Sequence, residues 1–87
     1  MINLDGISIE ELEEFVQKTE QDKVAFAKEL FPDKPGGYVK ALNILEKYAK
    51  AKIEAMKDRV NGRIQRALKH EEECEKFYRI LPDYAQW

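Results

Sequence analysis

The chain has 87 residues, of which 44% are hydrophobic and 37% are charged, and its formal net charge at pH 7 is −2. This length allows one domain with one core, and the composition excludes a disordered chain. One cysteine excludes an internal disulfide, and no apolar run reaches the roughly 20 residues that span a bilayer. The first residues also lack a signal-peptide pattern. We therefore expect one cytoplasmic domain over residues 1–87.

Two short helices are predicted in the first third of the chain. Ser8 is a good N-cap and Glu11 follows three residues later, which predicts a helix over about 9–18. The apolar spacing fails at Thr19 and then resumes, which predicts a second helix over about 20–31 with Thr19 as its N-cap. One continuous, kinked helix is the alternative.

Two long helices joined by a tight turn are predicted over about 38–60 and 63–81. The loop before them, residues 32–37, reads Pro-Asp-Lys-Pro-Gly-Gly and stops helix. Asn61-Gly62 separates two apolar stripes of helical spacing, so the chain reverses there into an antiparallel hairpin. The sequence therefore predicts an all-α fold: a small helical bundle built on this hairpin, with the two short N-terminal helices across one side.

The two stripes also predict the register of the hairpin. If the chain reverses at Asn61-Gly62, residues whose numbers sum to about 123 face each other. One charge interrupts each stripe, and these two charges, Lys52 and Glu71, then lie opposite. Because a charge buried alone costs several kcal/mol, we predict that they form an interhelical ion pair. The apolar members of the stripes are Leu42, Leu45, Ala49 and Met56 on one helix and Ile64, Ala67, Leu68, Cys74, Tyr78 and Leu81 on the other.

A second apolar row runs beside the stripe of helix 38–60 and consists of Ala41, Ile44, Tyr48, Ala51 and Ala55. One facing helix covers one stripe, so this row is either covered by the N-terminal helices or left as a groove or dimer face. The tail after Pro82 either folds back as a lid or presents Trp87 as an anchor for a partner. The candidate interaction surface comprises Ile44, Tyr48, Ala51, Ala55, Tyr84 and Trp87.

Charge is distributed unevenly along the chain. Residues 1–33 carry nine acidic and three basic side chains. Residues 34–69 carry three acidic and ten basic side chains, and residues 70–87 carry five acidic and two basic ones. The basic middle is either a face for nucleic acid or is balanced internally by the acidic helices. The candidate basic face comprises Lys40, Lys47, Lys50, Lys57, Arg59, Arg63 and Arg66.

No catalytic, cofactor or metal site is predicted. His70, Glu73 and Cys74 share one helical turn, but the chain has no second histidine or cysteine to complete a metal site. The cysteine also has no evident base and is expected to be buried. We therefore expect a non-catalytic protein that binds another protein or itself, with a nucleic-acid-associated regulator as the alternative.

Two resemblances concern the second half of the chain. Ala55, Gly62 and Ala67 match the small-residue spacing of a tetratricopeptide-type hairpin, which that part of the chain resembles. Residues 34–87 resemble a group of small uncharacterised bacterial and phage-encoded helical proteins, which implies no activity. The residues that carry the second resemblance are Tyr48, Ala49, Lys52, Ala55, Met56, Arg59, Gly62, Ile64, Ala67, Glu71, Cys74, Tyr78, Leu81, Pro82, Ala85 and Trp87.

Overall fold

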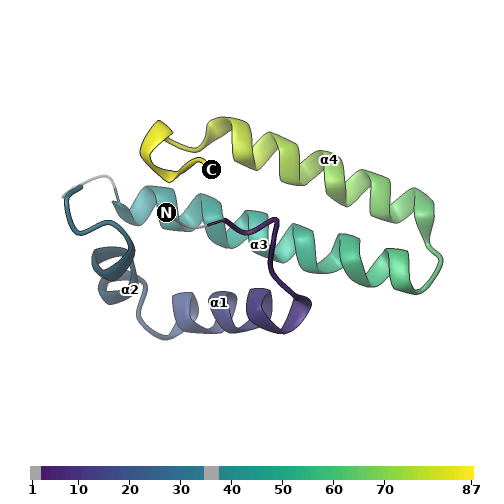
Figure 1. The fold of residues 1–87 in the computed structure, drawn as a ribbon, viewed down its shortest axis with the longest axis horizontal. Coiled ribbons are helices and arrows are strands. Elements are labelled where there is room, and N and C mark those ends of the chain that lie inside the picture. The colour runs from purple at the N-terminus through teal and green to yellow at the C-terminus, as the bar shows by residue number, and fades with distance from the viewer. Residues whose placement is uncertain (1–2, 35–37) are drawn as a thin grey trace.

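Helices account for most of the chain. The computed structural model describes residues 3–34 and 38–87, and the predicted loop residues 35–37 lie outside these ranges. The described residues contain four α-helices, one 3-10 turn and no strand, which confirms the all-α fold class (Figure 1). The elements are α1 (Ile9–Gln21), α2 (Lys23–Leu30), α3 (Tyr38–Val60), α4 (Ile64–Ile80) and η1 (Asp83–Ala85).

The boundary between α1 and α2 lies three residues later than predicted. Ser8 caps α1, and its Oγ accepts a hydrogen bond of 3.2 Å from the amide of Glu11. The cap of α2 is Asp22, whose carboxylate accepts from the amide of Ala25 at 3.1 Å. Thr19 is buried within α1 and donates its hydroxyl to the helix backbone, so the prediction of Thr19 as N-cap was wrong. A threonine hydroxyl can bond the carbonyl one turn back inside a helix, whereas the carboxylate of Asp22 is a better cap.

The turn at Asn61-Gly62 reverses the chain as predicted. Gly62 has a φ of 77°, in the left-handed region. The amide of Arg63 donates to the carbonyl of Asp58 at 2.7 Å, and the amide of Gly62 donates to that of Arg59 at 3.1 Å. These two hydrogen bonds define a Schellman motif, which ends α3 and directs the chain into α4.

We expect Gly62→Ala to lower the free energy of unfolding by about 1–2 kcal/mol, because an L-residue is strained in the left-handed conformation. No heavy atom lies within 4 Å of the position a Cβ would take at Gly62, so the cost is purely conformational. Gly6→Ala is the matched control, since Gly6 has the same open space and is not among the positive-φ glycines. Equal urea midpoints for the two variants would contradict the strain at Gly62.

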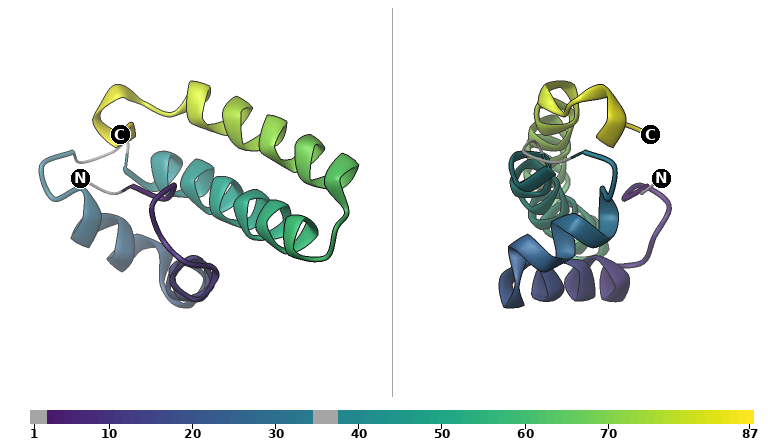
Figure 2. Two further views of the ribbon diagram at one scale, coloured as in Figure 1. Left: turned by 45° about the vertical axis from the view of Figure 1, so that its right-hand side comes forward. Right: turned by 90° about the vertical axis from the view of Figure 1, so that its left-hand side faces the viewer.

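Helix α3 is the centre of the bundle. Helix α4 packs antiparallel along one side of it, and α1 and α2 lie on another side (Figures 1 and 2). The N-terminal segment and the C-terminal tail lie together on a third side, and the fourth side is open (Figure 2). The core lies where the helices meet, and its fully buried leucines are Leu4, Leu12, Leu42 and Leu45.

The second apolar row of α3 is covered within the chain. Tyr48, Ala51 and Ala55 are buried, and Ile44 is half-buried against the core. The Cys74 thiol of α4 donates to the Tyr48 carbonyl and the Trp87 ring packs on the Tyr48 ring, so α4 and the tail lie against this row. These four residues therefore form no open apolar groove or dimer face, which is the second of the two alternatives from the sequence.

The stripe of α4 is less buried near the turn than its spacing predicts. Leu68 is 47% exposed, Ile64 is about half exposed, and Val60 at the end of α3 is 81% exposed. Leu68 lies in the wall of a groove along α3 and α4 instead of in the core. No helix among the described residues is long and apolar enough to cross a membrane.

Candidate functional site

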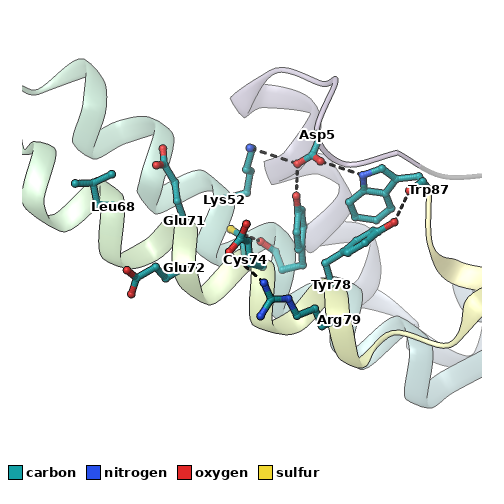
Figure 3. A pocket seen from close by; sticks show the side chains of 11 residues that line it. Asp5, Lys52, Leu68, Glu71, Glu72, Cys74, Tyr78, Arg79 and Trp87 are labelled. Carbon is teal, nitrogen blue, oxygen red and sulfur yellow. Dashed lines mark hydrogen bonds and ion pairs between the residues drawn. The ribbon is translucent and has the colours of Figure 1, made fainter.

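A groove of about 700 Å³ lies along α3 and α4, beneath the C-terminal tail (Figure 3). Its walls combine three aromatic rings, four carboxylates and two cationic side chains with one leucine and one thiol. The lining residues are Asp5, Tyr48, Lys52, Leu68, Glu71, Glu72, Cys74, Glu75, Tyr78, Arg79 and Trp87.

Asp5 joins three parts of the chain at one end of this groove (Figure 3). Its carboxylate accepts hydrogen bonds from the Tyr48 hydroxyl and from Trp87 Nε1, the latter at 3.0 Å. The Lys52 ammonium lies 3.4 Å from the same carboxylate. We call Asp5, Tyr48, Lys52 and Trp87 the carboxylate cluster. It ties the N-terminal segment to α3 and to the tail.

The tail folds back over the groove. The Trp87 ring lies edge-to-face on Tyr48 and Tyr78, with centroid distances of 5.0 and 4.9 Å. The Tyr78 hydroxyl donates to the Trp87 carbonyl, and the side-chain amide of Gln86 donates to the Leu81 carbonyl at 3.1 Å. Tyr84 packs edge-to-face on a core phenylalanine. Of the two alternatives from the sequence, the structure therefore shows the tail as a lid, and Trp87 is half-buried.

The cluster shifts the pKa values of two of its members. Partial burial acts to raise the pKa of Asp5, but hydrogen bonds from Tyr48 and Trp87 and the charge of Lys52 outweigh it, so this pKa lies below its ordinary value. Burial, and then the hydrogen bond to Asp5, raise the pKa of the Tyr48 phenol. The tyrosine therefore stays a donor and Asp5 stays an acceptor across the neutral range.

We expect the lid to loosen only in acid, below about pH 4. Because the pKa of Asp5 is lowered by folding, its contribution is complete above its unfolded-state pKa and is lost as the pH falls through the folded-state value. Trp87 is the single tryptophan of the chain, so its fluorescence reports the lid directly. Asp5→Asn should abolish this transition. A transition centred above pH 5, or one retained in Asp5→Asn, would contradict the role of Asp5.

The predicted Lys52–Glu71 ion pair is replaced by two others. Lys52 pairs with Asp5, and Glu71 pairs with Arg59 through two hydrogen bonds, one of 2.7 Å between Arg59 Nη2 and Glu71 Oε1. The hydrogen bond from Arg59 lowers the pKa of Glu71. The register itself agrees with prediction, since the Cys74 thiol donates to the Tyr48 carbonyl at 3.9 Å.

Side-chain direction explains why these partners changed. In an antiparallel hairpin, side chains of α3 lean away from the turn and those of α4 lean toward it. Long side chains directly opposite each other therefore diverge, as Lys52 and Glu71 do. Arg59 lies nearer the turn than Lys52, so it converges with Glu71.

The seven residues of the candidate basic face do not share one face. Arg59 is held by Glu71, and Arg63 and Arg66 lie 3.6 and 4.0 Å from the carboxylate of Asp58. The four lysines are exposed along α3, and the ammonium of Lys50 lies 3.1 Å from Glu20 of α1. The spacing of seven, three and seven residues keeps these lysines on one side of the helix. We call Lys40, Lys47, Lys50 and Lys57 the lysine stripe.

Asp58 is a buried charge that sequence reasoning missed. It is 1% exposed, and three basic side chains of the α4 end surround it: Arg63, Arg66 and His70, whose Nε2 lies 3.6 Å away. Its Oδ2 has no hydrogen-bond partner. These three basic side chains are spaced one turn apart on one face of α4, and this spacing was the sequence signal that could have predicted an acidic partner. The role of Asp5 had no signal, because it lies in a segment without periodicity.

The thiol of Cys74 lies in the wall of the groove and is buried. Burial raises the pKa of the Cys74 thiol to about 11, so the thiol stays protonated near neutral pH and is a poor nucleophile. His70 Nδ1 lies 3.2 Å from Glu73 rather than at the cysteine. Within residues 3–34 and 38–87, no group of three or more His, Cys, Asp or Glu side chains is placed to hold a metal ion.

Comparison of the chain with protein-family models, with curated proteins and with solved structures gives no match.

Proposed function

We propose that the chain is a small, non-catalytic module that binds another protein through the groove along α3 and α4. The observation that carries this proposal is the groove lining, where tyrosine, tryptophan and a half-exposed leucine are flanked by charged side chains. Protein interfaces combine buried aromatic anchors with a polar rim in this way. Nine of the eleven lining residues belong to two packed helices, so most of the surface is ordered before a partner arrives. The lone cysteine fits a reducing compartment such as the cytoplasm.

Site-specific photocrosslinking tests this proposal. A photocrosslinking amino acid at Leu68, in the groove, should yield one discrete protein adduct that excess unlabelled wild-type protein suppresses. The matched control places the same amino acid at Lys47, which is exposed on α3 and does not line the groove. An adduct formed from Lys47 but not from Leu68 would contradict binding in the groove.

The partner is expected to be a different protein. The apolar row that would form a dimer face on α3 is covered within the chain, so we expect a monomer across a wide concentration range in sedimentation velocity. A dimer whose population rises with concentration would instead make a second copy the partner.

The lysine stripe supports a second candidate function, binding to nucleic acid. Its four lysines are exposed along α3, and Lys50 also lies 3.1 Å from Glu20 of α1. Contacts to as many as four phosphates predict that log K falls with log salt at a slope of up to about −3.6. Glu54 lies among these lysines and weakens the stripe. Binding of an RNA or DNA oligonucleotide that is unaffected by salt would count against this function.

A further inference from the structure

We propose that Tyr48, Lys52 and Trp87 form a carboxylate-binding site, which Asp5 fills within the chain and an acidic side chain of a partner protein fills in the complex. This deepens, and rests on, the function proposed above. The partner segment is thus expected to carry an aspartate or glutamate that enters the groove beside Trp87.

The geometry of the three donors supports this site. Tyr48 and Lys52 are one turn apart on α3, and the tail brings Trp87 to the same point (Figure 3). All three meet one carboxylate, with Trp87 Nε1 at 3.0 Å and Lys52 Nζ at 3.4 Å. Tyr48 is only 3% exposed, so its hydroxyl needs an acceptor from the protein or from a ligand.

The chemistry of the donors selects an anion. An ammonium group and an indole N–H can only donate hydrogen bonds, and the raised pKa of Tyr48 keeps its hydroxyl protonated. Once Asp5 had left, a lysine or arginine of a partner would meet the Lys52 ammonium and would find only the Tyr48 hydroxyl oxygen as an acceptor among these three groups. A carboxylate provides two oxygens that accept from all three donors, as Asp5 itself shows.

Asp5 is held in a way that allows exchange. Its side chain is half exposed and it lies outside any helix, so a competing group can reach the donors from solvent. Gly6 follows, with open space around it, and gives the backbone freedom to turn the side chain outward. Leu4 is fully buried and keeps the segment attached to the core. The exchange therefore requires rotation of one side chain and no unfolding.

Chemical rescue tests the site directly. Asp5→Ala removes the internal carboxylate, and sodium acetate should then restore the Trp87 emission saturably, whereas sodium chloride at the same ionic strength should not. Asp5→Ala combined with Lys52→Met should show no rescue, because the ammonium is lost. Asp83→Ala is the matched control, since Asp83 is exposed on the tail. Acetate should leave the Trp87 emission of this variant unchanged. Equal effects of acetate and chloride on Asp5→Ala would overturn the proposal.

A peptide measurement tests the partner class. The acetylated and amidated peptide Asn-Leu-Asp-Gly-Ile-Ser, which copies residues 3–8, should bind Asp5→Ala at least about tenfold more tightly than wild type, because the internal competitor is absent. The same peptide with asparagine in place of aspartate should bind at least about tenfold more weakly. Equal affinity for both proteins, or for both peptides, would overturn the carboxylate site.

Two further results keep the alternatives apart. If Asp5→Ala does not fold, Lys52→Met and wild type are compared instead, and unchanged peptide affinity between them overturns the proposal. If acetate and the peptide fail while Leu68 still crosslinks to a protein, the groove stands and the carboxylate site is wrong. If both ligands bind but Leu68 yields no adduct, the carboxylate site stands and the proposed protein-binding groove is wrong.

Discussion

Leu45→Ala is expected to lower the free energy of unfolding by about 3–5 kcal/mol. Leu45 is fully buried on α3, and its truncation leaves a cavity in the hydrophobic core. A domain of this size is stable by about 4–13 kcal/mol in total, so the loss is a large share of its stability. Urea unfolding followed by circular dichroism measures it.

Leu68→Ala is the matched control for this cavity. The sequence assigns Leu45 and Leu68 to equivalent apolar stripes, but Leu68 is half exposed in the groove near the turn. We therefore expect Leu68→Ala to cost about 1 kcal/mol or less. Similar costs for the two substitutions would show that Leu68 is buried in solution, and the groove lining would then be wrong.

Asp58→Asn is expected to lower the free energy of unfolding by about 2–3 kcal/mol. The substitution keeps the shape of the buried side chain but removes its charge, which faces Arg63, Arg66 and His70. The new amide N–H group would moreover point at cations or remain without an acceptor. Thermal and urea unfolding at pH 7 measure the effect.

The control for Asp58 is the same substitution at an exposed aspartate. Asp83→Asn on the tail should change the stability by no more than about 0.5 kcal/mol. If Asp58→Asn were as stable as wild type, the basic side chains at the start of α4 would contribute nothing through Asp58. The hairpin would then be held there by the Schellman turn at Gly62 alone.

The sequence by itself determined the hairpin. The periodic apolar residues of α3 and α4 must be buried, and Asn61-Gly62 is a local signal for a left-handed helix end, so both helices and their reversal follow from short-range physics. The start of α1 at Ser8 was also predictable from the local sequence, because an N-cap depends only on the residues next to it. The boundary at Asp22 was missed because Thr19 and Asp22 are both acceptable caps, and burial of Thr19 in the packed fold decided between them.

Only the tertiary structure decided the partners of the charged side chains. Lys52 and Glu71 lie opposite each other by number, but the lean of side chains in antiparallel helices separates them and brings Arg59 to Glu71. Whether the second apolar row on α3 was a groove or a covered face depended on how segments distant in sequence, such as the tail with Trp87, pack against it.

The candidate site was the least predictable part. Asp5 and Trp87 are separated by almost the whole chain, and neither lies in a periodic element that could place it. Their contact exists because the packed helices bring the N-terminal segment and the tail to the same side of α3 (Figure 2). Local sequence patterns determine helices and turns, whereas a hydrogen bond between distant segments depends on how those helices pack.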